Sequence, residues 1–193
     1  MNKLFSVFLF AMPYHAVAFE QDNRGLYLGA GFGKTTYEED DWTTSNATGI
    51  RSNDSSWKII AGYRINSMWH IEGTYTSYGT IEQIDRYKFE PNAFTLAANG
   101  GYTFSNAIRP FGIIGLSALD LSQSQPILQD DKGIAIRLGF GIEYMPTQFN
   151  DVTLRIAYEG DGFAVSNRSF IDVDTDIFLG SYYFSATYAL SND

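Results

Sequence analysis

Apolar residues alternate with small or polar residues along most of the chain. Between residues 25 and 33 the two sets fall on opposite faces of an extended chain, with Leu26, Leu28, Ala30 and Phe32 on one face and Tyr27, Gly29, Gly31 and Gly33 on the other. A period of two predicts β-strands that each have one apolar face. Because the pattern recurs in segment after segment without a long hydrophobic run, it is typical of a barrel that crosses an outer membrane with strands.

Turn signals and alternation together predict eight strands, which makes the expected fold an all-β, antiparallel, up-and-down transmembrane barrel. We place the strands at residues 25–37, 55–65, 69–80, 92–104, 108–120, 133–145, 151–160 and 174–190. The connections alternate in length: those at 66–68, 105–107 and 146–150 are short, whereas those at 38–54, 81–91, 121–132 and 161–173 are longer and more polar. Short periplasmic turns and longer outer loops are expected of such barrels.

In four strands the ionisable residues all lie on the face opposite the large apolar side chains. A charge facing lipid near the middle of the bilayer costs about 2–4 kcal/mol for Arg or Lys, so the apolar face is predicted to contact lipid. That set comprises Trp57, Ile59, Ala61, Tyr63 and Ile65; Trp69, Ile71, Gly73 and Tyr75; Ile136, Leu138, Phe140, Ile142 and Tyr144; and Val152, Leu154, Ile156 and Tyr158. The strand at 108–120 has apolar residues on both faces, and its orientation is left unassigned.

The interior of an eight-stranded barrel is just wide enough to be filled by side chains. We therefore expect the inward-facing charges to form a structural network of ion pairs, made of Lys58, Arg64, Glu72, Arg137, Glu143, Arg155 and Glu159. A gated conduction path through the same lumen is the alternative interpretation.

Aromatic residues gather beside the short turns, as in the girdle that membrane barrels place at the headgroup level. The predicted girdle consists of Tyr63, Trp69, Tyr102, Phe104, Tyr144 and Tyr188. A soluble barrel of the lipocalin type would also carry such aromatics, but it would turn the apolar faces inward and the charges toward solvent. The N-terminal segment and the alternation of loop lengths favour the membrane barrel.

The N-terminal segment has the features of a cleavable export signal. Lys3 precedes an apolar stretch over residues 4–12, and Ala16-Val17-Ala18 offers a small-x-small cleavage site. We expect residues 1–18 to be removed and the mature barrel domain to comprise residues 19–193. The chain has no cysteine, so it can cross an oxidising periplasm without mispairing. Its net charge of −9 argues against nucleic acid as a partner.

Several segments resemble the small eight-stranded outer-membrane barrels of the outer membrane protein A and X type. Residues 62–75 carry a Gly-Tyr strand end, a short turn and a strand with an inward Glu, and residues 109–112 and 154–159 are similar to the fifth and seventh strands of that family. The resemblance implies a bacterial outer-membrane barrel, monomeric, whose loops serve adhesion, host interaction or envelope integrity. One departure is the chain end, where Leu190 rather than a terminal Phe occupies the last apolar position.

We predict no catalytic residue, no cofactor and no metal site. His70, the only histidine after residue 18, follows a short turn and is interpreted as a hydrogen-bonding lumen residue. The glycine-rich run at 29–33 is not followed by a helix, which excludes a nucleotide-binding loop. Acidic clusters at Glu38–Asp41, Asp130 with Asp131, and Asp172–Asp176 could gather Ca²⁺ or Mg²⁺, but they are interpreted as solvated loop charge.

The leading hypothesis is a non-enzymatic scaffold that presents acidic loops, with outer-membrane lipid, lipopolysaccharide and host or environmental surface ligands as partners. The second is a narrow channel or small-ligand transporter. The third is a lipid-modifying enzyme.

Overall fold

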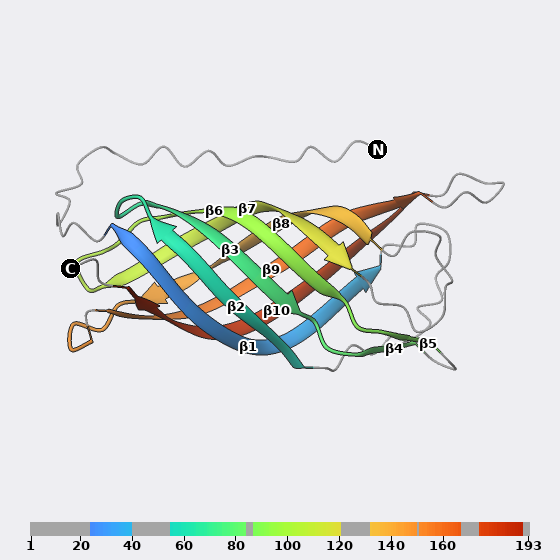
Figure 1. Cartoon of the computed structure of the whole chain (residues 1–193), viewed down its shortest axis with the longest axis horizontal. Coiled ribbons are helices and arrows are strands. Elements are labelled where there is room, and N and C mark those ends of the chain that lie inside the picture. The colour runs from blue at the N-terminus through green and yellow to red at the C-terminus, as the bar shows by residue number, and fades with distance from the viewer. Residues whose placement is uncertain are drawn as a thin grey trace, which may run out of the picture.

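Eight antiparallel strands close into a barrel in the computed structural model, which describes residues 24–39, 55–83, 87–120, 132–149, 151–166 and 174–190 (Figure 1). The barrel strands are β1 Gly25–Glu39, β2 Ser55–Arg64, β3 Trp69–Ser77, β6 Asn92–Gly101, β7 Ile108–Asp120, β8 Lys132–Tyr144, β9 Val152–Ser166 and β10 Asp174–Ala189. Each pairs with its neighbours in the chain, and β1 pairs with β10 to complete the closure. The predicted fold class is confirmed, whereas the predicted signal peptide lies outside the described residues.

The two ends of the barrel differ. The start of β1, the end of β10 and the connection between β2 and β3 lie at one end, at the left of Figure 1. At the opposite end β3 leads into a small hairpin of β4 Ile81–Gln83 and β5 Tyr87–Phe89. The longer connection predicted at 81–91 contains this hairpin, which forms a two-stranded sheet separate from the barrel. Among the described residues no helix is long and apolar enough to cross a membrane.

Two strand ends differ from the predicted positions for identifiable reasons. β6 ends at Gly101 rather than at 104, because its ladder meets Pro110, which has no N–H to donate. Tyr102 N and Phe104 N still donate to the carbonyls of Pro110 and Ile108. β9 runs to Ser166 rather than to 160. The Gly-Asp-Gly sequence at 160–162 suggested a turn, yet all three residues stay paired with β10.

Burial alternates along the strands as the sequence predicted. On β2 every second residue from Ser56 to Arg64 is buried, and those between them are exposed. Burial also gives the orientation of β7, the strand whose facing was left unassigned. Phe111 and Ile113 face inward and are 6% and 5% exposed, whereas Ile114 and Leu116 face outward and are 61% and 63% exposed. The outward wall of the barrel is thus apolar and exposed, and the lumen holds the buried side chains.

The lumen also contains a small apolar core. It is formed by Ala97, Phe111, Ile113, Ala157 and Tyr183. Phe111 lies opposite Gly141 and Ile113 opposite Gly139 in the register of β7 with β8. Because the two glycines project nothing into the lumen, two large apolar side chains fit beside the charges.

Gly62 makes room for the ring of Tyr27 inside the barrel. A Cβ atom at position 62 would collide with the ring carbons and hydroxyl of Tyr27, which is 2% exposed. Gly73, on the outward face, is different, since the nearest atom to its Cβ would be the Ala61 carbonyl oxygen at 3.8 Å.

We predict that Gly62→Ala destabilises the barrel by about 1–3 kcal/mol, the usual range for overpacking a filled interior. Gly73→Ala serves as the matched control, because both changes reduce the flexibility of the unfolded chain equally. Urea unfolding of the refolded protein in detergent measures both. Equal stability of the two variants would show that Tyr27 is not held against Gly62.

Candidate functional site

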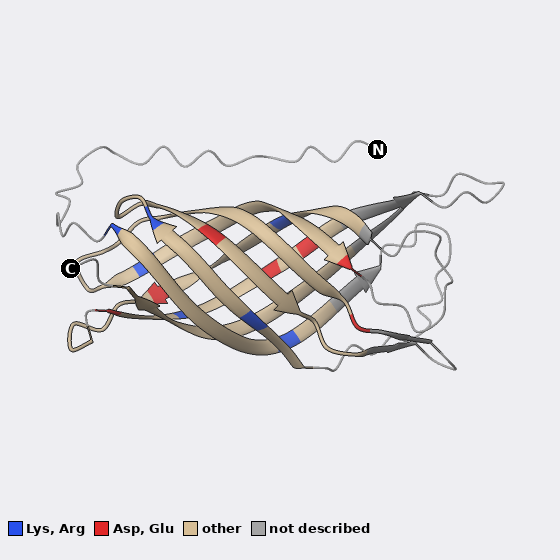
Figure 2. Cartoon of the chain, viewed as in Figure 1, with Lys and Arg blue, Asp and Glu red and all other residues tan. Residues whose placement is uncertain are grey.

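Charged residues lie along several of the barrel strands (Figure 2). All seven residues predicted for the lumen are buried, and Arg109 and Asp161 join them; each of the nine is at most 8% exposed. The set is Lys58, Arg64, Glu72, Arg109, Arg137, Glu143, Arg155, Glu159 and Asp161. Alternation explains their placement, since each occupies an inward position of its strand.

Arg155 is the centre of the network in the half of the lumen near the short turns. Its guanidinium donates to Glu72 from Nη1 at 2.9 Å and from Nη2 at 2.5 Å, which is a bidentate arrangement. The same group donates to Glu143 Oε1 from Nε at 3.0 Å and from Nη2 at 2.6 Å. Arg109 Nη1 donates to the other carboxylate oxygen of Glu143, Oε2, at 2.9 Å. Three strands, β3, β8 and β9, are thereby joined through one side chain.

Neutral groups occupy the remaining acceptor positions of this cluster. Tyr27 Oη donates to Glu72 Oε1 at 2.7 Å, and Asn99 Nδ2 donates to the same oxygen at 2.8 Å. Asn99 in turn accepts from Arg109 at 2.9 Å. A buried carboxylate with every oxygen accepting hydrogen bonds is far less costly than an unpaired one.

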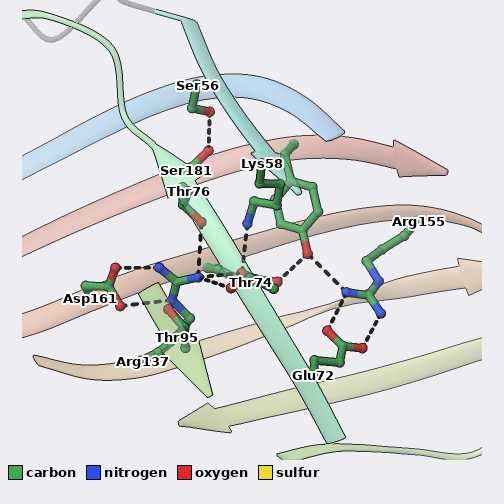
Figure 3. A network of polar contacts seen from close by, with 12 residues as sticks. Ser56, Lys58, Glu72, Thr74, Thr76, Thr95, Arg137, Arg155, Asp161 and Ser181 are labelled. Carbon is green, nitrogen blue, oxygen red and sulfur yellow. Dashed lines mark hydrogen bonds and ion pairs between the residues drawn. The ribbon is translucent and has the colours of Figure 1, made fainter. Parts of the chain in front are cut away.

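A second cluster fills the half toward the β4–β5 hairpin, as the close view shows (Figure 3). Arg137 forms a bidentate pair with Asp161, at 2.9 Å from Nε and 2.5 Å from Nη2. Lys58 Nζ donates to Glu159 at 2.8 Å. Tyr183 joins the two clusters, because its hydroxyl donates to Glu159 and lies 3.5 Å from Nη1 of Arg155.

Tyr78 closes this cluster from the hairpin side. It follows β3, is 1% exposed, and donates from its hydroxyl to Asp161 at 2.5 Å while accepting from Arg137 at 3.0 Å. Its backbone is held as well, since its N–H donates to the Pro91 carbonyl at 2.9 Å and its carbonyl accepts from Thr35 at 2.6 Å. The base of the hairpin is thus tied to the lumen.

Arg64 lies apart from the ion pairs. In the described part of the chain it donates to Thr153 at 2.9 Å, and its guanidinium carbon is 5.3 Å from the centre of the Tyr27 ring. His70 is also near Tyr27, with the ring centres 6.0 Å apart in an edge arrangement. His70 is buried at the end away from the hairpin, where the sequence placed it.

The network is close to fully satisfied. Among the buried side-chain polar atoms of the described residues, Arg109 Nε and Ser185 Oγ are the two without a hydrogen-bond partner. Arg137 is an example of a buried donor with several acceptors. Its Nη1 also donates to the hydroxyl oxygens of Thr74 at 3.1 Å and Thr76 at 3.3 Å. Such an interior fixes the strands in register.

Sequence reasoning missed several members of the network, among them Arg109, Asp161 and Tyr78. Arg109 was missed because β7 was left without an orientation, although Glu143, directly opposite it in the register, was already predicted to face inward. Asp161 was missed because the seventh strand was predicted to end at 160, whereas β9 continues to Ser166. Tyr78 lies at an inward position of the predicted strand at 69–80, and that position was the signal that could have identified it.

The predicted girdle residues lie at the end of the barrel with the short turns. The outward-facing ones, which are 43–54% exposed, are Tyr63, Trp69, Phe104, Tyr144 and Tyr188. Tyr102 is half-buried and packs edge-on against Phe104, with ring centres 5.1 Å apart. The side chains of Glu38 and Glu39, and the acidic residues at 40–41, 130–131 and 172, fall outside the part of the structure that can be described.

A closed eight-stranded barrel with an apolar outer wall and a charged lumen defines an integral membrane β-barrel. Residues 4–184 match the family of outer membrane protein beta-barrel domains, and the chain belongs to this family. It is therefore an integral protein of the bacterial outer membrane. No curated protein matches the sequence significantly.

Solved structures of small outer-membrane barrels are similar in fold. Neisserial surface protein A is 18% identical with a TM-score of 0.61, covering 86% of this chain and 97% of its own. Ail of Yersinia pestis, in complex with the heparin analogue sucrose octasulfate, is 16% identical with a TM-score of 0.52, covering 86% and 99%. Outer membrane protein AlkL, in lipid bilayers, is 15% identical with a TM-score of 0.56, covering 100% and 99%. At these identities the likeness concerns the fold.

We predict that Glu72→Ala lowers the stability of the barrel by about 3–5 kcal/mol, because it removes one of the two carboxylates that neutralise the buried Arg155 and leaves Tyr27 and Asn99 without their acceptor. The temperature at which the folded band disappears on a gel should fall markedly. Glu90→Ala is the control, since Glu90 is exposed and lies outside the network. If the folded band of both variants disappeared at the same temperature, Glu72 would not stabilise the network.

Proposed function

We propose that the protein is a non-enzymatic scaffold of the outer membrane that presents acidic loops for adhesion, host or environmental contact, or envelope integrity. The observation that carries this proposal is the filled lumen. Interlocking side chains occupy it from Tyr27 at one end to Tyr78 at the other, and Tyr78 is 1% exposed beneath the hairpin. With the interior occupied, contact with the surroundings falls to the loops and the outer wall.

The negative charge of the loops indicates which kinds of surface they would attract. The end of β1 and the connection that follows it carry Glu38, Glu39, Asp40, Asp41 and Asp54 against a single basic residue, Arg51. The connection between β7 and β8 adds Asp130 and Asp131. A sulfated polyanion of the kind bound to Ail would be repelled by these loops. We infer a positively charged surface or one bridged through divalent cations.

The outer wall supports lipid as the second partner. Its exposed side chains are large and apolar, and we propose that the aromatic residues at the turn end form the periplasmic girdle. At the opposite end the wall would meet lipopolysaccharide, the lipid of the outer leaflet. The barrel closes on itself without a second copy, which supports a monomer.

A narrow channel is the second candidate. It is favoured by the surplus of cations in the described lumen, where Lys58, Arg64, Arg109, Arg137 and Arg155 outnumber Glu72, Glu143, Glu159 and Asp161. Conduction would require the Arg137–Asp161 pair and Tyr78 to move aside. Because these groups hold one another at 2.5–3.0 Å, the closed scaffold is the better supported function.

We predict that cells producing the protein adhere better to polycation-coated surfaces than cells without it, and that they gain nothing on heparin-coated surfaces. The combined change Glu38→Gln, Glu39→Gln, Asp40→Asn and Asp41→Asn should remove most of the gain, and added salt should weaken it because surface charge interactions are screened. Retained cells are counted after washing, with surface levels of the two proteins matched. A gain that persists in the variant, or that appears on heparin, would contradict the proposal.

A further inference from the structure

The charges of the described lumen are balanced in one half of the barrel and unbalanced in the other. The half toward the β4–β5 hairpin holds two cations and two carboxylates, which are Lys58, Arg137, Glu159 and Asp161. The half near the short turns holds three cations and two carboxylates, which are Arg64, Arg109, Arg155, Glu72 and Glu143. The surplus positive charge of the lumen therefore lies at the end with the short turns.

Arg64 carries this surplus charge. Arg155 and Arg109 already donate to both oxygens of Glu143. Among the described residues Arg64 forms no ion pair, and it donates a hydrogen bond from Nη2 to Thr153 Oγ1 at 2.9 Å. A buried charge without a counter-charge is costly. An anion that reached the Arg64 guanidinium would therefore be held there.

The Arg64 guanidinium is accessible from the mouth of the barrel. Arg64 is the last residue of β2, at the short-turn end in Figure 1, and at 8% it is the most exposed of the nine lumen charges. A guanidinium has five N–H donors. In the described part of the chain, Arg109 Nε and Ser185 Oγ are the sealed polar atoms without a partner. The unused N–H groups of Arg64 are therefore open to solvent.

The neighbours of Arg64 provide space and further donors. Gly25, at the start of β1, pairs with Arg64, and among the described atoms a Cβ at position 25 would approach the Leu190 carbonyl oxygen alone, at 3.7 Å. Thr153 lies opposite Thr187, and both side chains are buried. Because the Thr153 hydroxyl accepts from Arg64, its own proton is available to donate. The mouth thus combines one unpaired cation, two hydroxyl groups and an unfilled position.

The amount of charge and its shape indicate which anion fits. One surplus cation balances one negative charge, and the planar guanidinium fork matches a carboxylate in a bidentate arrangement. A doubly charged anion would exceed the surplus and would be repelled by Glu72 and Glu143, which lie deeper in the same half. Asp151, the described carboxylate at the turns of this end, is exposed and forms no ion pair with Arg64.

We propose that the mouth of the barrel at the short-turn end binds a small monocarboxylate. The mouth site consists of Arg64, Thr153, Thr187 and the space beside Gly25. The carboxylate accepts from the unused N–H groups of Arg64 and from the two hydroxyl groups, and it neutralises the surplus charge of the lumen. That the ligand comes from the periplasm rests on the orientation in the proposed function, whereas the binding chemistry does not depend on it or on the loops.

The test is a titration followed by nuclear magnetic resonance. The refolded, ¹⁵N-labelled full chain in detergent receives sodium acetate at neutral pH, and parallel samples receive sodium sulfate or sodium chloride at the same ionic strength. The signals observed are the Nε–H of Arg64 and the backbone amides of Thr153 and Thr187. Arg64→Gln removes the cation of the mouth site. Arg24→Gln is the matched control, because it removes the same charge from an exposed residue at the same end.

We expect acetate to cause saturable shifts of these signals in the wild type and in Arg24→Gln with equal affinity. Arg64→Gln should bind acetate at least roughly tenfold more weakly, the effect of losing a hydrogen bond to a charged group. Sulfate and chloride should shift the signals far less. Should Arg64→Gln not fold, Thr153→Val removes one hydroxyl without changing the side-chain shape, and it should weaken acetate binding severalfold.

Three results would overturn the mouth site. Equal shifts with acetate, sulfate and chloride would indicate an adventitious ion only. Acetate binding that persists in Arg64→Gln would place the anion elsewhere, and the absence of saturable shifts in the wild type would show that Arg64 takes no external carboxylate. The variant with the loop charges at 38–41 neutralised should keep full acetate binding. Failure of the mouth site and failure of the adhesive function can therefore be told apart.

Discussion

The bridge that Arg155 makes between Glu72 and Glu143 is the interaction on which the rest of the interior depends. It joins β9 to β3 across the lumen and to β8 beside it, with hydrogen bonds of 2.5–3.0 Å. All three groups are nearly inaccessible to solvent, so each charge would be costly without the others. Because a shift of one residue would turn every side chain of a strand to the other face, these pairs also fix the register.

The side chains in the lumen explain why contact with other molecules is expected at the outer wall and the connections. Tyr183 and Tyr78 extend the network from Arg155 to the hairpin end, where Asp161 receives hydrogen bonds from Arg137 and Ser117 as well. Side chains rather than an open passage therefore occupy the axis of the barrel. The proposed function accordingly assigns lipid contact to the outer wall and contact with the surroundings to the connections at the hairpin end.

Alternation was sufficient to predict the barrel and most of its lumen. Lys58, Glu72, Arg137 and Arg155 each stand between apolar neighbours whose placement in lipid leaves the charge no other position. The orientation of β7 could not be obtained in this way, because Phe111 and Ile113 are as apolar as Ile114 and Leu116. Phe111 shares its face with Arg109, which forms an ion pair with Glu143 directly opposite on the neighbouring strand, and that pairing is known only once the register is known.

The conductance of the purified barrel in planar lipid bilayers tests most directly whether the lumen is closed. The account predicts no steady conductance for the wild-type monomer, and the appearance of conducting events when Arg137→Ala and Asp161→Ala are combined. Removing both partners takes away the pair without leaving an unpaired buried charge. Steady conductance of the wild-type protein, unchanged in the double variant, would contradict a lumen closed by its own side chains.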